Sequence, residues 1–235
     1  MIFKMSNPWR HYRYVSRSWR RLLDLRGAGG PVTMLEIGAG SSVILPKTLA
    51  AYNQNSRYIT VNENQALTRA FRQKTRRLPI VIDIIEGDAV HAETRLPPES
   101  VDILAFEHSM NDILQAILMA RDGVDTAQAS WFRLLPDMIT RMNAAYRGGE
   151  FEAALKAPFM ALLQSCTAAL KPGGLLALSH YMFQYDLNLG YDPWLWENML
   201  PLVRPWLGEL PGGREITLEG YDAQWWFFWE KQSIK

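Results

Sequence analysis

Short apolar runs alternate along the chain with longer stretches in which apolar residues recur every three or four positions. The runs that we predict as strands cover residues 32–37, 57–61, 80–85, 101–106 and 175–179. The stretches that we predict as helices cover residues 8–25, 42–52, 65–77, 111–121, 127–146 and 150–170. Strands that alternate with helices predict a parallel sheet with helices on both faces.

The pattern changes near the C-terminus. Residues 215–218 and 225–229 read as two strands with only a short loop between them, which predicts an antiparallel hairpin at one edge of the sheet. The whole chain, 1–235, is therefore expected to form one α/β domain around a seven-stranded, mostly parallel sheet. Three segments exceed this minimal arrangement: an N-terminal helical cap at 1–30, a helical insertion at 111–150, and a lid-like segment rich in proline, tryptophan and tyrosine at 181–213.

The composition adds few constraints. A net charge of +1 over 235 residues gives no overall preference for a polyanionic partner. Cys166 is the single cysteine, so the chain has no intrachain disulfide, which fits a reducing cytosol. The first residues lack the apolar run of a secretion signal, and no run approaches the ~18 apolar residues of a membrane span. We expect a cytoplasmic protein that needs no metal ion and no membrane.

The candidate chemistry begins where the first predicted strand ends, in the turn Gly38-Ala39-Gly40. Ligands of open parallel sheets bind outside the carboxyl ends of the strands, where glycines allow the backbone to approach closely. A dinucleotide site would require a third glycine, but Val43 stands there. Glu36, two residues before the first glycine, would repel a pyrophosphate and attract a cation. The turn therefore favours a positively charged ligand.

The run from Leu35 to Gly40 resembles motif I of class I S-adenosylmethionine-dependent methyltransferases, with Ser42 in place of the last motif glycine. The resemblance extends over about residues 32–180 and implies a Rossmann-like fold that binds S-adenosylmethionine and releases S-adenosylhomocysteine. It includes the family's frequent turn before the fifth strand, here Leu170-Lys171-Pro172-Gly173-Gly174.

The resemblance also assigns cofactor contacts to residues at the ends of the later strands. An acid after the second strand would bind the ribose hydroxyls, and we choose Glu63, although Asn62 is an alternative. Asp88 and Ala89 would bind the adenine. With Glu107 at the end of the fourth strand, the expected cofactor-binding residues are Glu36, Gly38, Ala39, Gly40, Glu63, Asp88, Ala89 and Glu107.

The methyl acceptor is expected beside the ends of the fourth and fifth strands. The sequence after Phe106 lacks the Asn/Asp-Pro-Pro-Tyr-like motif of enzymes that methylate DNA bases or protein glutamine. His108 is our candidate general base, since a histidine titrates near neutral pH, although it could equally serve only for hydrogen bonding or packing. His180, Tyr181 and Tyr14, the last from the N-terminal helix, are candidate substrate-binding residues.

Three functions remain open. We expect methyl transfer to an oxygen or nitrogen of a small-molecule acceptor. An RNA methyltransferase is the alternative, because the N-terminal helix and residues 69–77 are rich in arginine, and the helix also carries Trp9 and Trp19. Convergence of the two basic clusters on the cofactor cleft would favour RNA, but the low net charge makes nucleic acid the weaker expectation. The third possibility is a protein that binds S-adenosylmethionine without methyl transfer.

The aromatic C-terminal strand leaves a structural alternative open. Trp225, Trp226 and Trp229 fit an ordinary edge-strand core, and they also fit the surface of a homodimer.

Overall fold

The strands of the sheet form where the apolar runs were expected. The computed structural model describes residues 8–181 and 184–233, and for residues 8–11 and 184–185 it describes the backbone alone. The strands are β1 (Thr33–Ile37), β2 (Arg57–Asn62), β3 (Val81–Glu86), β4 (Val101–Glu107), β5 (Leu170–Ser179), β6 (Gly213–Ile216) and β7 (Trp226–Lys231). Their order in the sheet is β3-β2-β1-β4-β5-β7-β6. The prediction of a seven-stranded, mostly parallel sheet with an antiparallel C-terminal hairpin is confirmed.

Only β7 runs against the other strands. It pairs antiparallel with both β5 and β6, so the second strand of the hairpin lies inside the sheet and β6 forms the edge. This position explains its composition, because a strand paired on both sides and covered by helices needs apolar side chains on both faces. Residues 225–229 are each at most 3% exposed, so these aromatic side chains belong to the core of this chain.

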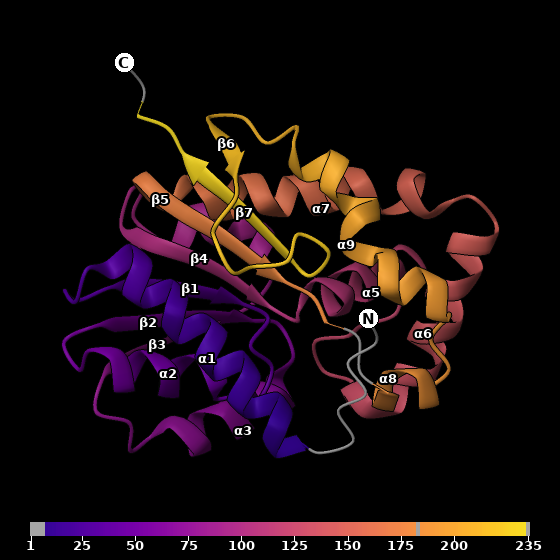
Figure 1. Cartoon of the computed structure of the whole chain (residues 1–235). Helices are drawn as coiled ribbons and strands as arrows, with labels where there is room; N and C mark the ends of the chain where they lie inside the picture. The colour runs from indigo at the N-terminus through magenta and orange to yellow at the C-terminus, as the bar shows by residue number, and fades with distance from the viewer. Residues whose placement is uncertain (1–7, 182–183, 234–235) are drawn as a thin grey trace.

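Helices cover both faces of the sheet (Figure 1). One face carries α1 (Pro8–Gly27), α2 (Ile44–Tyr52) and α3 (Gln65–Thr75). The other carries the short helices η1 (Ala89–His91) and α4 (Ala92–Arg95), together with α5 (Met110–Arg121) and α7 (Phe151–Ala168). Beyond the ends of β4 and β5 lie α6 (Trp131–Arg147), α8 (Gln184–Asn188) and α9 (Pro193–Leu207).

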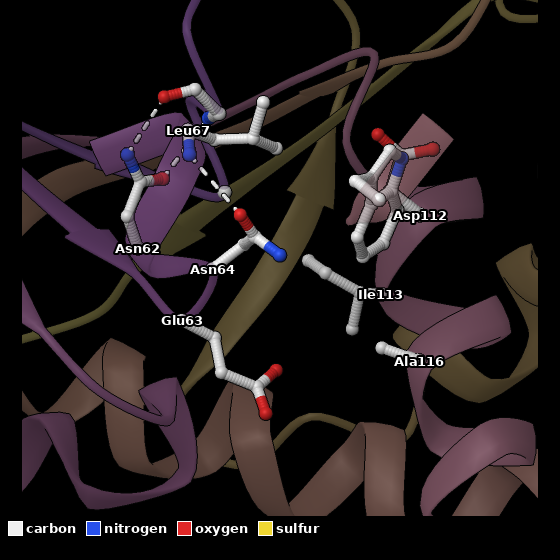
Figure 2. Close-up of a pocket in the computed structure, with 10 residues that line it drawn as sticks. Asn62, Glu63, Asn64, Leu67, Asp112, Ile113 and Ala116 are labelled. Atoms are coloured by element: carbon white, nitrogen blue, oxygen red, sulfur yellow. Dashed lines mark hydrogen bonds between the residues drawn. The ribbon is translucent and has the colours of Figure 1, made fainter. Parts of the chain in front are cut away.

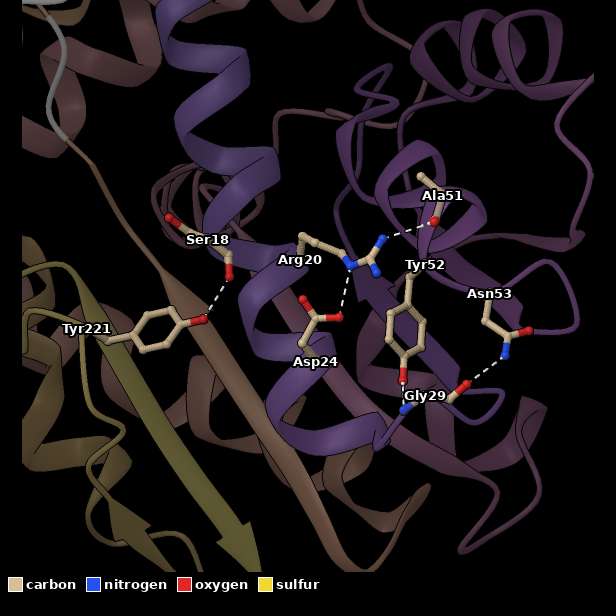
Figure 3. A network of polar contacts seen from close by, with 8 residues as sticks. All are labelled: Ser18, Arg20, Asp24, Gly29, Ala51, Tyr52, Asn53 and Tyr221. Atoms are coloured by element: carbon tan, nitrogen blue, oxygen red, sulfur yellow. Dashed lines mark hydrogen bonds and ion pairs between the residues drawn. The ribbon is translucent and has the colours of Figure 1, made fainter.

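Helix α1 is fixed to the fold by one buried apolar stripe and by polar contacts to two other segments. Val15, Trp19 and Leu22 are fully buried on one stripe, as their spacing predicts. Figure 3 shows the polar contacts that surround this stripe. Arg20 donates to the carbonyl of Ala51 at 3.0 Å, and the hydroxyl of Tyr221 donates to the carbonyl of Ser18 at 2.7 Å. Helix α1 is therefore tied both to α2 and to the segment before β7.

Several local features differ from the sequence expectations: the short helices η1, α4 and α8 were not predicted, and β6 begins two residues earlier than expected. The turn at 171–174 does not precede β5 but forms a bulge within it, where Gly173 has a φ of +74° and the register with β4 shifts. Helix α9 was not anticipated, because Pro201 and Pro205 lie inside it. A local signal for α9 was present: Asp192 caps the helix by accepting from the backbone N–H groups of residues 194 and 195, and Pro193 occupies the first turn.

Within the described part of the chain, no helix combines the length and apolar character that a membrane crossing requires.

Candidate cofactor and acceptor site

The candidate site lies where the order of the strands reverses. The chain proceeds from β1 outward to β2 and β3, then returns to place β4 on the other side of β1. Open α/β sheets bind their ligands at the crevice that such a reversal creates. The turn after β1 and the turn after β4 meet there, since the hydroxyl of Ser109 donates to the carbonyl of Ile37 at 2.7 Å.

The backbone of the first turn requires glycine at both positions, and the contact with Ser109 requires it at Gly38. Gly38 has a φ of +72°, and a Cβ added to it would lie 3.1 Å from the Cβ of Ser109. Gly40 has a φ of +56°. Both values fall in the left-handed region that glycine adopts without a steric penalty. The motif therefore shapes the floor of the crevice directly.

Asn62, at the end of β2, holds the glycine turn from the side. Its side chain accepts a hydrogen bond from the backbone N–H of Gly40 at 3.0 Å and donates to the carbonyl of Gly40 at 2.9 Å (Figure 2). This role was missed by the sequence analysis, which considered Asn62 only as an alternative to Glu63. The sequence signal for this role is an amide side chain, which accepts through its oxygen and donates through its nitrogen.

Two neighbouring cavities follow the carboxyl ends of the strands, with open volumes of about 460 and 550 Å³. They share Gly38, Glu63, Ile113 and Ala116, so they form one continuous crevice. The first is also lined by Gly40, Asn62, Asn64, Leu67, Asp112 and Trp131, as Figure 2 shows in part. The second is also lined by Ile37, Val61, Gly87, Asp88, Ala89, Ile117, Ala120 and Leu162.

Glu63 and Asp88 stand together in this crevice, as predicted for adjacent strand ends. Burial raises the pKa of Glu63, and the nearby Asp88 raises it further. Asp88 itself accepts from the backbone N–H of Val90 at 2.9 Å and so caps η1. Each carboxylate retains acceptor capacity beyond these contacts, since an ionised carboxylate accepts several hydrogen bonds.

Glu36 occupies a different place from the one expected. Its carboxyl is 1% exposed and accepts a hydrogen bond from the hydroxyl of Tyr58, and Glu36 is not among the residues that line either cavity. Burial raises the pKa of Glu36 well above its ordinary value, and Glu107 nearby acts in the same direction. The structure thus places the carboxyl of Glu36 against Tyr58 of β2 and outside the lining of both cavities.

Glu107 ends β4 at the crevice and is 8% exposed. One of its carboxyl oxygens, Oε1, is buried without a hydrogen-bond partner. Burial raises the pKa of Glu107 to about 7, and the carboxyl of Asp112 contributes to this rise. Asp112, in the first turn of α5, has a pKa of about 7 for corresponding reasons: burial first, then the charge of Asp186.

The candidate acceptor residues lie beside these carboxyls. His108 has a φ of +52°, and its Nδ1 accepts from the backbone N–H of Tyr181 at 3.3 Å. Its ring stacks on that of His180 with the centroids 5.4 Å apart. The ring of Tyr181 meets that of Tyr14 edge-on at 5.5 Å, which brings α1 to the end of β5.

His180 is held as a neutral ring. Its Nε2 lies 3.0 Å from the carbonyl of Trp196, so this nitrogen carries the proton. Its Nδ1 is buried without a partner, and burial lowers the pKa of His180 to about 4.

The helical insertion contributes to the site through its connecting loop. The side chain of Asn64, which also caps α3, donates to the carbonyls of Thr126 and Ala129 at 2.7 and 2.9 Å. These bonds hold the start of α6 over the first cavity, where Trp131 forms part of the wall. Trp131 was not predicted from the sequence, because only the folded loop brings it to the crevice; Asp112, also not predicted, comes there from the first turn of α5.

No protein-family model and no curated protein sequence matches the chain. Solved structures do. A SAM-dependent methyltransferase from Aquifex aeolicus superposes with a TM-score of 0.53 at 12% identity, covering 97% of this chain and 94% of that one. A protein from Methanococcus maripaludis, provisionally assigned as an S-adenosyl-L-methionine-dependent methyltransferase, gives a TM-score of 0.57 at 10% identity, covering 95% and 86%.

The CurJ carbon methyltransferase gives a TM-score of 0.50 at 14% identity, and covers 94% of this chain and 54% of its own. At these identities the likeness concerns the fold. Together with the strand order, it shows that the chain has the Rossmann-like fold of class I S-adenosylmethionine-dependent methyltransferases, as its sequence motifs led us to expect.

Proposed function

We propose that the protein binds S-adenosylmethionine and transfers its methyl group to an oxygen or nitrogen of a small-molecule acceptor. One observation carries the proposal. Among the described residues, the charged side chains that line the two cavities are all acidic: Glu63, Asp88 and Asp112. A dinucleotide pyrophosphate would be repelled there, whereas a sulfonium and an ammonium group would be attracted. Glu36 and Glu107 add buried carboxyls behind and beside the glycine turn.

The residues present fit such a cofactor from end to end. Glu63 would accept from the ribose hydroxyls, and Asp88 with the backbone N–H of Ala89 would bind the adenine edge. The backbone of residues 38–40 would lie against the methionine portion. The apolar side chains of Ile113 and Leu162 in the second cavity would pack on the flat base, as apolar cavity walls commonly do.

When bound, the cofactor would supply an activated methyl group, and the protein's task would be largely positioning. An in-line displacement needs the acceptor atom, the methyl carbon and the sulfur aligned at near-contact distance. The ends of β4 and β5, with His108, His180 and Tyr181, border the place from which an acceptor would approach. Tyr14 on α1 closes this side and excludes water from it.

The basic clusters support a small acceptor over RNA. Three arginines of these clusters form ion pairs: Arg20 with Asp24, Arg26 with Glu230, and Arg72 with Glu86. Arg26 also binds the carbonyl of Gly173, near the start of β5 and far from the carboxyl ends of the strands. Engaged cations offer less attraction to a phosphate backbone than free ones do.

The proposal is tested by following the methyl group. The purified protein would be incubated with methyl-labelled S-adenosylmethionine and, in parallel, with a small-metabolite extract or with total RNA. We expect label in low-mass products of the extract. Label incorporated into RNA would replace the proposed acceptor with the polymer. Cofactor binding without transfer in either mixture would support the third function, a protein that binds the cofactor and does not methylate.

A further inference from the structure

Glu107 ends β4 between the glycine turn after β1 and the candidate acceptor residues after β5, beside the two cavities rather than in their lining. It is the last residue of β4, paired in register with Ser179 at the end of β5. Two residues later, Ser109 packs against Gly38 of the cofactor turn. On the sheet, Ala105 pairs with Glu36, so Glu107 and Glu36 project from the same face of neighbouring strands. The carboxyl of Glu107 therefore stands between the glycine turn and the acceptor side.

The carboxyl of Glu107 is also incompletely satisfied. Its Oε1 is buried and has no hydrogen-bond partner, which is costly for a group of this kind unless a ligand supplies a donor. The charged groups that shift the pKa values of Glu107 and Asp112 are other carboxyls, and the amide of Asn111 donates a hydrogen bond to Asp112. Titratable groups face Glu107 from every element packed around it. The direct neighbours are Glu36 on β1, Tyr58 on β2, Asp112 on α5, Tyr181 after β5, and the histidines His108 and His180. Asp186 and Tyr191 interact with Asp112.

The two histidines are less suited to take a proton. The Nδ1 of His108 already accepts from the backbone N–H of Tyr181, so a neutral ring presents Nε2 with its proton in place. His180 has an open Nδ1, but burial lowers its pKa to about 4, which makes it a weak base. A base works best when its pKa lies near the working pH, and the pKa of Glu107 is about 7.

We propose that Glu107 is a catalytic residue, which is kept ionised by the bound sulfonium and takes up the proton that the acceptor loses on methylation. This inference rests on the proposed function. The step balances: the acceptor's N–H or O–H bond breaks and its proton joins the Glu107 carboxylate, while the methyl–sulfur bond breaks and a methyl–nitrogen or methyl–oxygen bond forms. Because methyl transfer would leave the cofactor sulfur uncharged, Glu107 would lose a positive neighbour as it gained the proton.

The coupling between the two events is electrostatic. A positive charge close to a buried carboxyl favours the ionised form, and removal of that charge favours protonation. The base is therefore strongest at the moment when the proton must be held. Asp112 is a positioning residue in this account, because its negative charge keeps the proton affinity of Glu107 high.

Proton release on ligand binding tests this without a known acceptor. Calorimetric titrations at a pH of about 7, in buffers of different ionisation enthalpy, give the number of protons released when S-adenosylmethionine or S-adenosylhomocysteine binds. A carboxyl that is half protonated before binding and ionised afterwards releases about half a proton. We expect the wild-type protein to release more protons with S-adenosylmethionine than with S-adenosylhomocysteine, by up to this amount.

Two variants sharpen the test. Glu107→Gln should lose the part of the difference in proton release that Glu107 supplies, whereas Asp112, which lines the first cavity and also has a pKa of about 7, keeps its own part. Asp112→Asn is the matched comparison: it should lose the part that Asp112 supplies and move the remainder to lower pH, because removal of a neighbouring negative charge lowers the pKa of Glu107. An undiminished difference in Glu107→Gln, or equal proton release by the wild-type protein with the two nucleosides, would overturn the role of Glu107. Failure of the wild-type protein to bind either nucleoside would instead refute the proposed function.

Discussion

Replacing Glu107 by glutamine should make the folding stability less sensitive to pH. The pKa of Glu107 is about 7 in the folded protein, against an ordinary value of 4.5. The folded state thus holds this proton more tightly than the unfolded chain does. The resulting stabilisation is complete below about pH 4.5 and is lost as the pH rises to about 7. With about 1.4 kcal/mol per pKa unit, the loss amounts to about 3 kcal/mol.

The effect is measured by comparing how much the free energy of unfolding changes with pH in the wild type and in the variant. Denaturant unfolding of the wild type and of Glu107→Gln would be compared at a pH of about 5 and of about 8, so that the titrating groups that do not interact with Glu107 cancel. We expect the free energy of unfolding to fall over this interval by about 2–3 kcal/mol more in the wild type than in the variant, which corresponds to roughly 5–10 °C in Tm for a domain of this size. The exposed Glu219, changed to glutamine, is the control and should follow the wild type. Parallel curves for wild type and Glu107→Gln would refute the reasoning.

Three further substitutions test the crevice. Gly38→Ala should destabilise the fold by about 1–3 kcal/mol in denaturant unfolding, because its φ of +72° and the 3.1 Å approach to Ser109 disfavour a Cβ; an unchanged midpoint would contradict this. Asn62→Ala removes both side-chain bonds to Gly40 and should weaken cofactor binding about tenfold by calorimetry, a loss of binding free energy larger than the loss of folding stability. Unchanged binding would show that the turn keeps its shape without Asn62. Asp88→Ala should cost about 1 kcal/mol as a lost cap and weaken binding of S-adenosylhomocysteine, and undiminished affinity would remove Asp88 from the adenine site.

The strands and most helices follow from local pattern because each buries one continuous apolar run or stripe. Helix α9 shows where that reasoning fails. Pro201 and Pro205 argue against a helix locally, yet burial of Trp196 and Trp206 at 1% and 3% exposure outweighs them. The bulge in β5 is similar, since only its pairing with β4 shows that the strand resumes beyond the turn.

The site was predicted best where it depends on backbone shape. Gly38, Glu63 and Asp88 meet at one edge because parallel strands end together. The sequence could not show that Glu36 bonds to Tyr58, since this depends on the register of β2, which pairs Glu36 with Thr60 and so brings Tyr58 to the same face. Nor could it show that Trp131 reaches the crevice, because that requires Asn64 to hold the loop between α5 and α6.

The central claim is that an acidic crevice at the ends of β1, β2 and β4 selects a cationic adenosyl ligand. Equilibrium titration of the purified protein with S-adenosylmethionine and with NAD⁺, under one set of conditions, tests it most directly. The account predicts saturable binding of S-adenosylmethionine that is weakened in Glu63→Gln, with no binding of NAD⁺. Binding of NAD⁺ without binding of S-adenosylmethionine would contradict it.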